Sequence, residues 1–180
     1  MTPTIKPDAQ EVTLPPLPSQ YSVDIRRSDG HRTLVFADGG KQRIEVYQRD
    51  GRKMVNIARP DLGLIWTIAS DAGHAVQRPL ASEEMSRVAQ PDDAYRWFLD
   101  GSETVDGKQF TRVAGQFREV NDGSIQQTYL LDMETGLRRR CITYDRAGQP
   151  RLRVEFECAT LGPQPSSLFE LPEGTVVDKL

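Results

Sequence analysis

Apolar and polar residues alternate along the first third of this chain in short runs, as in antiparallel β-strands that have one solvated face. Asp-Gly between alternating runs favours a tight hairpin, because a two-residue type I′ turn requires positive φ at both central positions. Such pairs stand at Asp29-Gly30, Asp38-Gly39, Asp50-Gly51, Asp100-Gly101, Asp106-Gly107 and Asp122-Gly123. The pattern predicts a meander of antiparallel strands, the first of which cover residues 20–59.

The predicted turns also determine which apolar side chains share a face. Two-residue turns at residues 29–30 and 50–51, with a three-residue loop at 38–40, align one row of residues across the sheet: Ile25, Leu34, Ile44 and Ile57, with Val23–Phe36 and Val46–Val55 beside it. A slip of one residue would turn each side chain to the other face. This face is either packed core or the lining of a cavity for an apolar ligand. The candidate lining residues are Leu34, Phe36, Ile44, Val46, Val55, Ile57, Trp66, Val154 and Phe156.

The middle of the chain predicts a helical region. Ser82 is a favourable N-cap for a helix that Pro91 ends. A second short helix is expected to place Tyr95, Phe98 and Leu99 on one face, at spacings of three and four. Strands then resume near residues 109–118, 124–132, 136–145 and 151–160.

These elements predict a mainly β protein with a short helical plug at Ser82–Leu99. A sheet of about ten strands must curl to cover its apolar face, so the expected architecture is a curved antiparallel sheet that forms a half-barrel. We expect one such domain over residues 20–180. Residues 1–19 hold five prolines and no apolar run, which indicates a disordered, extended leader that is neither a signal peptide nor a strand.

Size and charge narrow the classes of function. A chain of 180 residues is long enough to bury a substantial core. The formal net charge of -3 and the pI of about 5.5 provide no overall attraction to nucleic acid, so we expect no nucleic-acid partner. No stretch approaches the roughly 18 apolar residues of a membrane span.

The two cysteines lie on either side of a predicted hairpin near residues 146–150. Aligning the apolar faces of its strands places Tyr144 opposite Leu152, and this register puts Cys141 and Cys158 on opposite sides of the sheet. The register therefore predicts two free thiols.

The same register places two cations, Arg138 and Arg140, on an apolar face with Val154 and Phe156. Charged groups in such a place need partners or a route to water. One interpretation is that these arginines pair with acids of the helical region, such as Glu83 or Asp92. The other is that they hold an anionic or carbonyl group of a lipid-like ligand at the mouth of the cavity.

Sequence signatures of catalysis are missing from the chain. It has no G-x-S-x-G, H-E-x-x-H, C-x-x-C or G-x-x-x-x-G-K-[ST] motif. His31 and His74 lie beside turn residues, and with two cysteines on different faces they do not make a zinc site. We expect no cofactor, no metal and no enzymatic activity.

Several segments resemble the LolA/LolB-like superfamily. GSETVDG at 101–107 is similar to its G-x-E-x-V-x-G, and DMETGLR at 132–138 is similar to its D-x-x-T-G-L turn. LFELPEGTVVD at 168–178 looks like its closing F-x-x-P-x-G-x-x-V, and RPD at 59–61 before Trp66 resembles several uncharacterised members. The resemblance implies a half-barrel closed by helices around an apolar cavity, which in the lipoprotein carriers receives acyl chains. It also implies a periplasmic or exported location, with the export signal already removed from this chain.

The first functional hypothesis is a non-enzymatic protein that binds an acyl chain, a lipoprotein lipid or another apolar small molecule, with a membrane-associated protein as a further partner. The second is a protein-interaction or sensor domain whose cavity is filled by its own helical plug. The third is a cofactor-free enzyme that uses Arg138, Arg140 and Glu103 in the same cavity. The space between the sheet and the helical stretch would separate these hypotheses.

Overall fold

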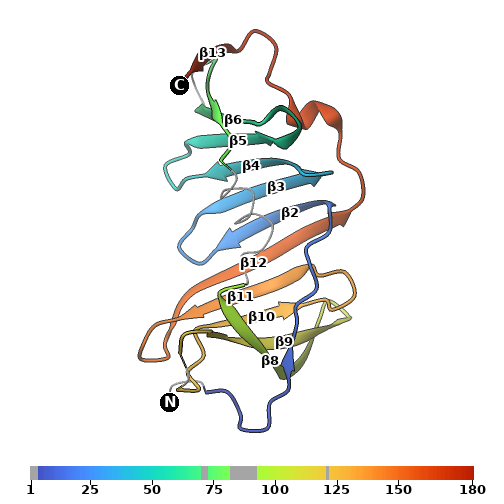
Figure 1. Cartoon of the computed structure of the whole chain (residues 1–180), viewed down its shortest axis with the longest axis vertical. Helices are drawn as coiled ribbons and strands as arrows, with labels where there is room; N and C mark the ends of the chain where they lie inside the picture. Colours follow the sequence, from blue (N-terminus) through green and yellow to red (C-terminus); the bar gives the residue numbers. More distant parts are fainter. Residues whose placement is uncertain (1–3, 70–72, 82–92, 121) are drawn as a thin grey trace. The chain divides into compact units, whose positions relative to one another are not determined.

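The computed structural model describes residues 4–69, 73–81, 93–120 and 122–180. Within these residues it contains thirteen β-strands and two short 3-10 helices, and the strand register is antiparallel except between β7 and β13 (Figure 1). The predicted mainly β class with an antiparallel sheet is therefore confirmed, with thirteen strands where about ten were expected. The chain forms two compact units, which we describe separately: the Trp97 unit (residues 1–18 and 89–156) and the Trp66 unit (residues 19–88 and 157–180).

In the Trp97 unit the strands follow one another in hydrogen-bonded order: β1 (Glu11–Val12), β8 (Tyr95–Val105), β9 (Lys108–Phe117), β10 (Gln127–Leu131), β11 (Arg138–Tyr144) and the first part of β12 (Pro150–Leu161). In the Trp66 unit the order from the end of β12 is β2 (Gln20–Arg27), β3 (Arg32–Asp38), β4 (Lys41–Tyr47), β5 (Lys53–Arg59), β6 (Leu64–Ala69), β7 (His74–Pro79) and β13 (Val176–Lys179). The 3-10 helices are η1 (Pro60–Leu62) and η2 (Ser166–Phe169).

The first three hairpins form where predicted, but each register differs from the prediction by one residue. The first and third loops have three residues: Arg27 N donates to His31 O at 3.0 Å, and Gln48 N donates to Arg52 O at 2.9 Å. In both loops a glycine with positive φ closes the turn, Gly30 at 87° and Gly51 at 85°, as in a type I turn followed by a bulge.

The second loop has two residues instead of three. Gly39 and Gly40 both have positive φ, 57° and 90°, which allows a tight two-residue turn between Asp38 and Lys41. The length of the first loop places Leu34 opposite Asp24 instead of Ile25, and the length of the second places it opposite Glu45 instead of Ile44.

These registers divide the predicted apolar row between two faces. Leu34, Phe36, Val55, Ile57 and Trp66 share one face of the Trp66 unit, whereas Ile44 and Val46 point to the other. The prediction that all six residues of strands β3–β5 line one surface is therefore wrong.

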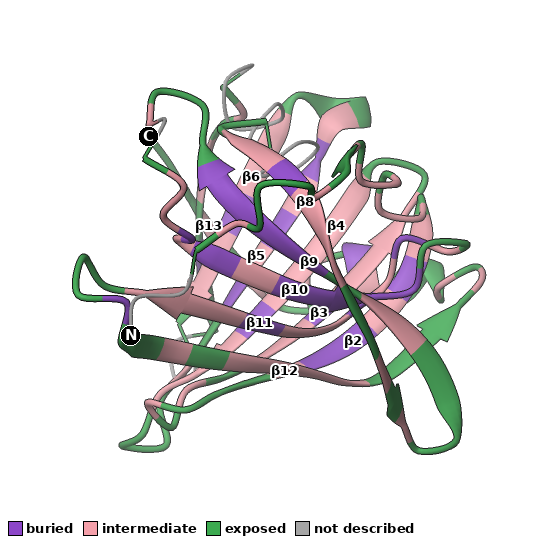
Figure 2. Ribbon diagram, turned by 90° about the horizontal axis from the view of Figure 1, so that it is seen from below, coloured by how far each residue is buried: buried purple, intermediate pink, exposed green. Residues whose placement is uncertain are grey.

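The face that carries Ile57 forms the core of the Trp66 unit. Val55, Ile57 and Trp66 are buried together with Phe169 from η2, and Phe36 packs against them. Ile57 is completely buried and Phe169 is 1% exposed, so η2 covers this part of the sheet closely. Figure 2 shows buried stretches, in purple, within the strands. Of the two interpretations of this face, packed core is therefore the one that these residues support.

A buried arginine fixes η2 over the sheet. Arg59 donates to the carbonyl oxygen of Phe169 at 3.2 Å and to the Glu170 carboxylate at 2.7 Å. Its other guanidinium edge pairs with Asp61 at 2.7 Å, and this hydrogen bond, although partly offset by burial, raises the pKa of Arg59. The RPD segment at 59–61 thus holds η2 over the core of the Trp66 unit.

The predicted helical region divides into two parts. Residues 82–92, with Ser82 and Pro91, lie outside the described residues. Tyr95, Phe98 and Leu99 belong to strand β8, so the second predicted helix is wrong. Tyr95, Trp97 and Leu99 alternate onto the core face, and burial of Trp97, which is 4% exposed, favours this period of two over the helical spacing.

The Trp97 unit has its own core, in which Trp97, Val113, Tyr129, Leu131 and Cys141 are buried. The rings of Trp97 and Tyr129 stack with centroids 4.7 Å apart. Partly buried side chains that pack against this core are Val12, Leu14, Tyr95, Leu99, Val154 and Phe156.

The N-terminal segment is structured where a leader without strands was expected. Glu11 and Val12 form β1 opposite Phe98 and Trp97, and Ile5 N donates to Gly123 O at 2.9 Å. The expectation of a disordered, strand-free leader is therefore wrong for these residues. That residues 20–180 form one domain stays a prediction.

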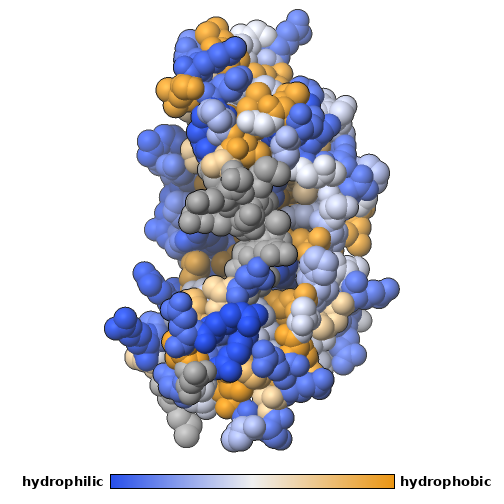
Figure 3. All heavy atoms as spheres, in the orientation of Figure 1, coloured by the Kyte–Doolittle hydropathy of each residue, from blue (hydrophilic) through white to orange (hydrophobic). Residues whose placement is uncertain are grey.

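The described surface carries scattered apolar side chains, including Leu62, Phe117, Leu161 and Val176. On the face in Figure 3 hydrophobic and hydrophilic residues interleave within each unit. Because these apolar side chains are scattered, a concave site is a better candidate for function than a flat surface patch. In the part of the chain that the structure describes, no helix is long and apolar enough to cross a membrane.

Candidate functional site

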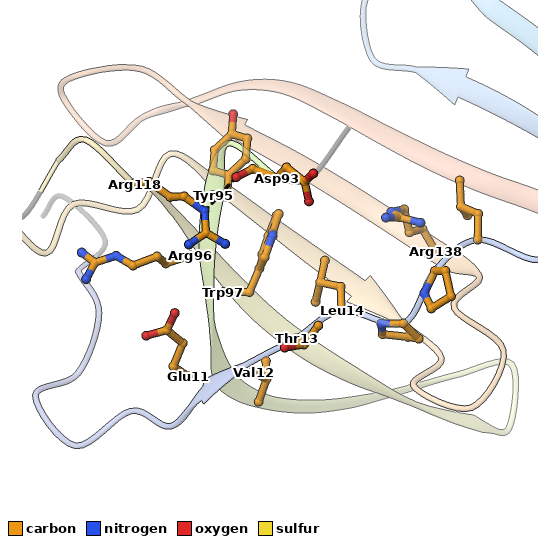
Figure 4. Close-up of a pocket in the computed structure, with 13 residues that line it drawn as sticks. Glu11, Val12, Thr13, Leu14, Asp93, Tyr95, Arg96, Trp97, Arg118 and Arg138 are labelled. Carbon is orange, nitrogen blue, oxygen red and sulfur yellow. Dashed lines mark hydrogen bonds between the residues drawn. The ribbon is translucent and has the colours of Figure 1, made fainter. Parts of the chain in front are cut away.

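The Trp97 unit contains a cavity of about 560 Å³ between strand β8 and residues 11–17, a segment that we call the strap (Figure 4). Val12, Leu14 and Leu17 of the strap contribute apolar side chains, and Tyr95 and Trp97 contribute aromatic rings from β8. Charged side chains complete the lining: Glu11, Asp93, Arg96, Arg118 and Arg138. The cavity therefore combines an apolar part with a charged part.

Pairing with β8 and two prolines explain the course of the strap. Leu99 N donates to Gln10 O at 2.9 Å, and Val12 pairs with Trp97, so the strap starts as a strand on the edge of β8. Proline has no N–H to donate, so Pro15 and Pro16 cannot continue the ladder. The strap then leaves the sheet edge, while its Leu14 side chain packs against the Trp97 core.

The strap approaches the turn before β11 closely at Gly136. Gly136 has a φ of 74°, and a Cβ at this position would collide with the carbonyl oxygen of Pro16. The turn before β11 therefore needs glycine both for its backbone conformation and for the close approach of the strap.

The aromatic floor of the cavity is well packed. The Tyr95 and Trp97 rings have centroids 5.4 Å apart, and Tyr95 stacks on Phe117 at 4.6 Å. Together with the Trp97–Tyr129 stack, these contacts extend aromatic packing across three strands. The floor is thus a fixed apolar surface against which a flexible guest can pack.

Three arginines give the lining an excess of positive charge over the two carboxylates of Glu11 and Asp93. Arg138 is 8% exposed, and its guanidinium lies over the Tyr129 ring at 5.0 Å from the centroid. Arg118 Nε donates to the carbonyl oxygen of Asp93 at 2.8 Å.

Arg96 Nη2 donates to Gln116 Oε1 on the neighbouring strand β9 at 2.7 Å, and this hydrogen bond is partly buried. Each of the three guanidinium groups is thus held in place by protein contacts. Figure 4 shows Arg96 and Arg118 on one side of Trp97 and Arg138 on the other, so the cations do not form one cluster. Guanidinium groups bind carboxylate and phosphate through several parallel N–H donors, so the cavity suits an anionic group.

A smaller cavity of about 170 Å³ also lies in the Trp97 unit, lined by Leu130 and Ile142 together with charged residues. Arg140 donates to Glu103 at 2.9 Å and to Glu155 at 2.9 Å. Burial lowers the pKa of Arg140, but the hydrogen bonds to these two carboxylates outweigh it, so its pKa is raised. Arg140 therefore lies within a built ion-pair network.

The structure separates the two arginines that were predicted to act together. A β-bulge places Arg138 opposite Leu131 and Arg140 opposite Leu130, so they point to opposite faces of the sheet. The prediction that they share a face is wrong, and so is the grouping of both with Glu103 in one catalytic cluster. The alternative partners Glu83 and Asp92 lie outside the described residues.

The register of the last hairpin also differs by one residue from the prediction. Val154 lies opposite Cys141 instead of Ile142, because a bulge near Tyr144 shifts the pairing of β11 with β12. Both cysteines are nevertheless free thiols, as predicted, with Cys141 buried and Cys158 exposed.

The nine apolar residues predicted to line a ligand cavity do not line either of these two cavities. Phe36, Val55, Ile57 and Trp66 belong to the Trp66 core, and Val154 and Phe156 pack against the Trp97 core. Leu34 shares the sheet face of Ile57, whereas Ile44 and Val46 lie on the reverse face. Arg138 is the predicted site residue that reaches the larger cavity.

Sequence reasoning missed Trp97 and the strap as parts of one site. The signals were present: Tyr95, Trp97 and Leu99 alternate, and so do Val12 and Leu14. Among the residues that the structure describes, no group of three His, Cys, Asp or Glu side chains could hold a metal ion. The chemistry that this site offers is apolar contact, aromatic stacking and cationic attraction.

No family model matches the sequence, and no curated protein does. An uncharacterized conserved protein from Thermus thermophilus has a similar structure, with a TM-score of 0.62 and 10% identity, over 91% of this chain and 92% of that one. A chain of the Pseudomonas aeruginosa MucA/MucB complex matches with a TM-score of 0.52 and 17% identity, over 89% of this chain and 58% of that one. MucB matches with a TM-score of 0.53 and 16% identity, over 88% of this chain and 60% of that one.

These similarities show a shared fold, and this chain spans about three fifths of MucB. The similar solved structures also include a LolA superfamily protein from Nitrosomonas europaea, with 12% identity and a TM-score of 0.34 over 84% of this chain and 89% of that one.

Proposed function

We propose that this protein is a non-enzymatic binding protein that holds an elongated apolar guest with an anionic group, such as a fatty acyl chain with its carboxylate, in the cavity under the strap. The observation that carries the proposal is a cavity of about 560 Å³ with aromatic and aliphatic walls and three arginines in its lining. Small-molecule pockets usually measure about 300–1,000 Å³ and combine apolar walls with few polar groups.

The relatives support the general class of this proposal. MucB has the same fold and was solved with MucA, so this fold can take a partner. The resemblance to lipoprotein carriers favours a lipid guest, a periplasmic or exported location and a membrane-associated protein as a further partner.

The test measures binding of a fluorescent fatty acid by a Trp66→Phe variant, in which Trp97 is the sole tryptophan and hence the energy donor. We expect saturable energy transfer from Trp97, displacement by unlabelled fatty acid and weaker displacement by the fatty alcohol of equal length. No transfer, together with no lipid in native mass spectra of the purified protein, would refute the proposal.

Two arginine variants locate the guest within the unit. Arg118→Gln removes a cation from the cavity lining and is expected to weaken fatty-acid binding at least about tenfold, because charge-assisted hydrogen bonds contribute roughly 1.5–3 kcal/mol. Arg153→Gln is the matched control, because Arg153 pairs with Glu155 and does not line this cavity. Equal loss in both variants would contradict the proposed position of the anionic group.

A further inference from the structure

The strap occupies the edge of a much longer strand. In the described part of the chain β1 has two residues, which pair with Trp97 and Phe98, whereas β8 has eleven residues. Main-chain pairing at a sheet edge is a general way to bind an extended peptide, with side-chain pockets that set specificity. The strap covers this edge with very few ladder hydrogen bonds.

The strap also shows what kind of peptide the edge accepts. Its residues alternate, with Val12 and Leu14 packed against the Trp97 core while Glu11 and Thr13 are exposed. The pairing is antiparallel, so the residues opposite the rest of β8, from Leu99 onward, are those that precede Glu11. A longer strand could therefore pair further along β8 through residues on that side of the strap.

Charge favours an acidic partner over a basic one. With the strap in place, the cavity lining holds three arginines and the carboxylates of Glu11 and Asp93. Departure of the strap takes Glu11 with it, so the remaining lining holds three arginines and one carboxylate, that of Asp93. In Figure 4 the labelled Arg96 side chain extends on the same side of β8 as Glu11, whereas Arg138 lies on the other side of Trp97.

We propose that the strap is an internal substitute for a partner's peptide, and that the edge of β8 binds an extended segment with alternating apolar residues and an acidic residue at the position of Glu11, by strand exchange. The strap leaves, the incoming strand pairs with β8, and its apolar side chains take the places of Val12 and Leu14. This inference goes beyond lipid binding and does not depend on it, since it rests on the sheet edge and the charges around it.

The test uses the full-length protein and a fluorescein-labelled peptide with the sequence of residues 8–14, which lie opposite β8 in this register. Fluorescence anisotropy is measured with this peptide, with a scrambled peptide and with a peptide that has lysine at the position of Glu11. We expect saturable binding of the first peptide, at least tenfold weaker binding of the lysine peptide, and no binding of the scrambled one. Equal binding of all three, or no binding of any, would overturn the proposal.

Variants of the strap test the exchange itself. Val12→Pro removes a ladder donor, and about tenfold tighter peptide binding is expected because less of the protein is held in the closed state. Arg153→Gln, which lies outside the strap and this cavity, should leave the affinity unchanged. Unchanged or weaker binding by Val12→Pro, with native circular dichroism, would exclude strand exchange.

Leu14→Ala weakens the strap through its apolar contact and is judged by the same criterion, so the proposal stays testable if Val12→Pro does not fold. The fatty-acid assay on the same samples separates the two proposals. Peptide binding without fatty-acid binding supports strand exchange alone, and the reverse result supports lipid binding alone.

Discussion

Gly115 offers the sharpest test of how the Trp97 core is packed. Thirteen of the fourteen glycines have positive φ, and Gly115 is the exception. A Cβ at this position would lie 2.7 Å from Cζ3 and 2.8 Å from Cη2 of Trp97, which faces it across the β8–β9 ladder. Gly115 is therefore required because of contact with the indole, and its backbone conformation does not require glycine.

The expected cost of Gly115→Ala follows from the confinement of this ring. Trp97 is 4% exposed and stacks on Tyr129, so the indole cannot move away without disturbing a second aromatic side chain. Overpacking of this kind typically lowers the free energy of unfolding by about 1–3 kcal/mol. For a chain of this size, that corresponds to a decrease in Tm of about 2–12 °C.

A double-mutant cycle isolates the contact. Trp97→Phe replaces the indole by a smaller ring, which leaves space for the new methyl group, so Gly115→Ala should cost much less in this background. We expect urea denaturation, followed by far-UV circular dichroism, to give a coupling energy of about 1 kcal/mol or more between the two substitutions. Additive effects within about 0.3–0.5 kcal/mol would show that the indole does not dictate glycine at position 115.

Three further predictions concern the two units and their charged groups. The Lys108 ammonium donates a hydrogen bond to Asp132 and holds the pKa of this carboxyl at about 2, below its usual 3.8. The ionised carboxylate therefore stabilises the folded protein above pH 3.8, and this stabilisation is lost as pH falls towards 2. Lys108→Ala should flatten this part of the dependence of unfolding free energy on pH in acid titrations. Ellman's reagent should modify the exposed Cys158 in the native protein and the buried Cys141 only after unfolding, and rapid modification of both would contradict the packing of β11. If residues 20–180 form one domain, single-tryptophan variants that report on either unit should show the same denaturation midpoint, whereas two separate midpoints would indicate two domains.

The strands could be predicted from the sequence because alternation and turn residues are local signals. Their registers could not, because they depend on how each glycine is used. At Gly39-Gly40 two positive φ angles make a two-residue turn, whereas Gly30 and Gly51 each end a three-residue loop. Asp-Gly is compatible with both loop types, and a difference of one residue reverses the face of every following side chain.

The candidate site was harder to predict because its parts are distant in the sequence. Tyr95 and Leu99 satisfy the spacing of a helix and that of a strand equally well, and only burial of Trp97 between them decides for the strand. The strap is rich in proline, and its structure depends on pairing between Val12 and Trp97, which no local pattern of residues reveals. Tertiary pairing therefore determines both the fold of this segment and the presence of the cavity.

The bulge in β11 shows why residue type alone did not identify the ligand-facing cation. Arg138 and Arg140 are two positions apart, so a regular strand would place both guanidinium groups on one face. The extra residue, Arg139, reverses this relation, so that Arg138 reaches the larger cavity and its guanidinium lies over the Tyr129 ring. Arg140 faces Glu103 and Glu155 instead, where two carboxylates already accept its hydrogen bonds. An anionic guest is therefore expected to depend on the arginines that line the larger cavity, Arg118 among them, while loss of Arg140 should affect stability and not binding.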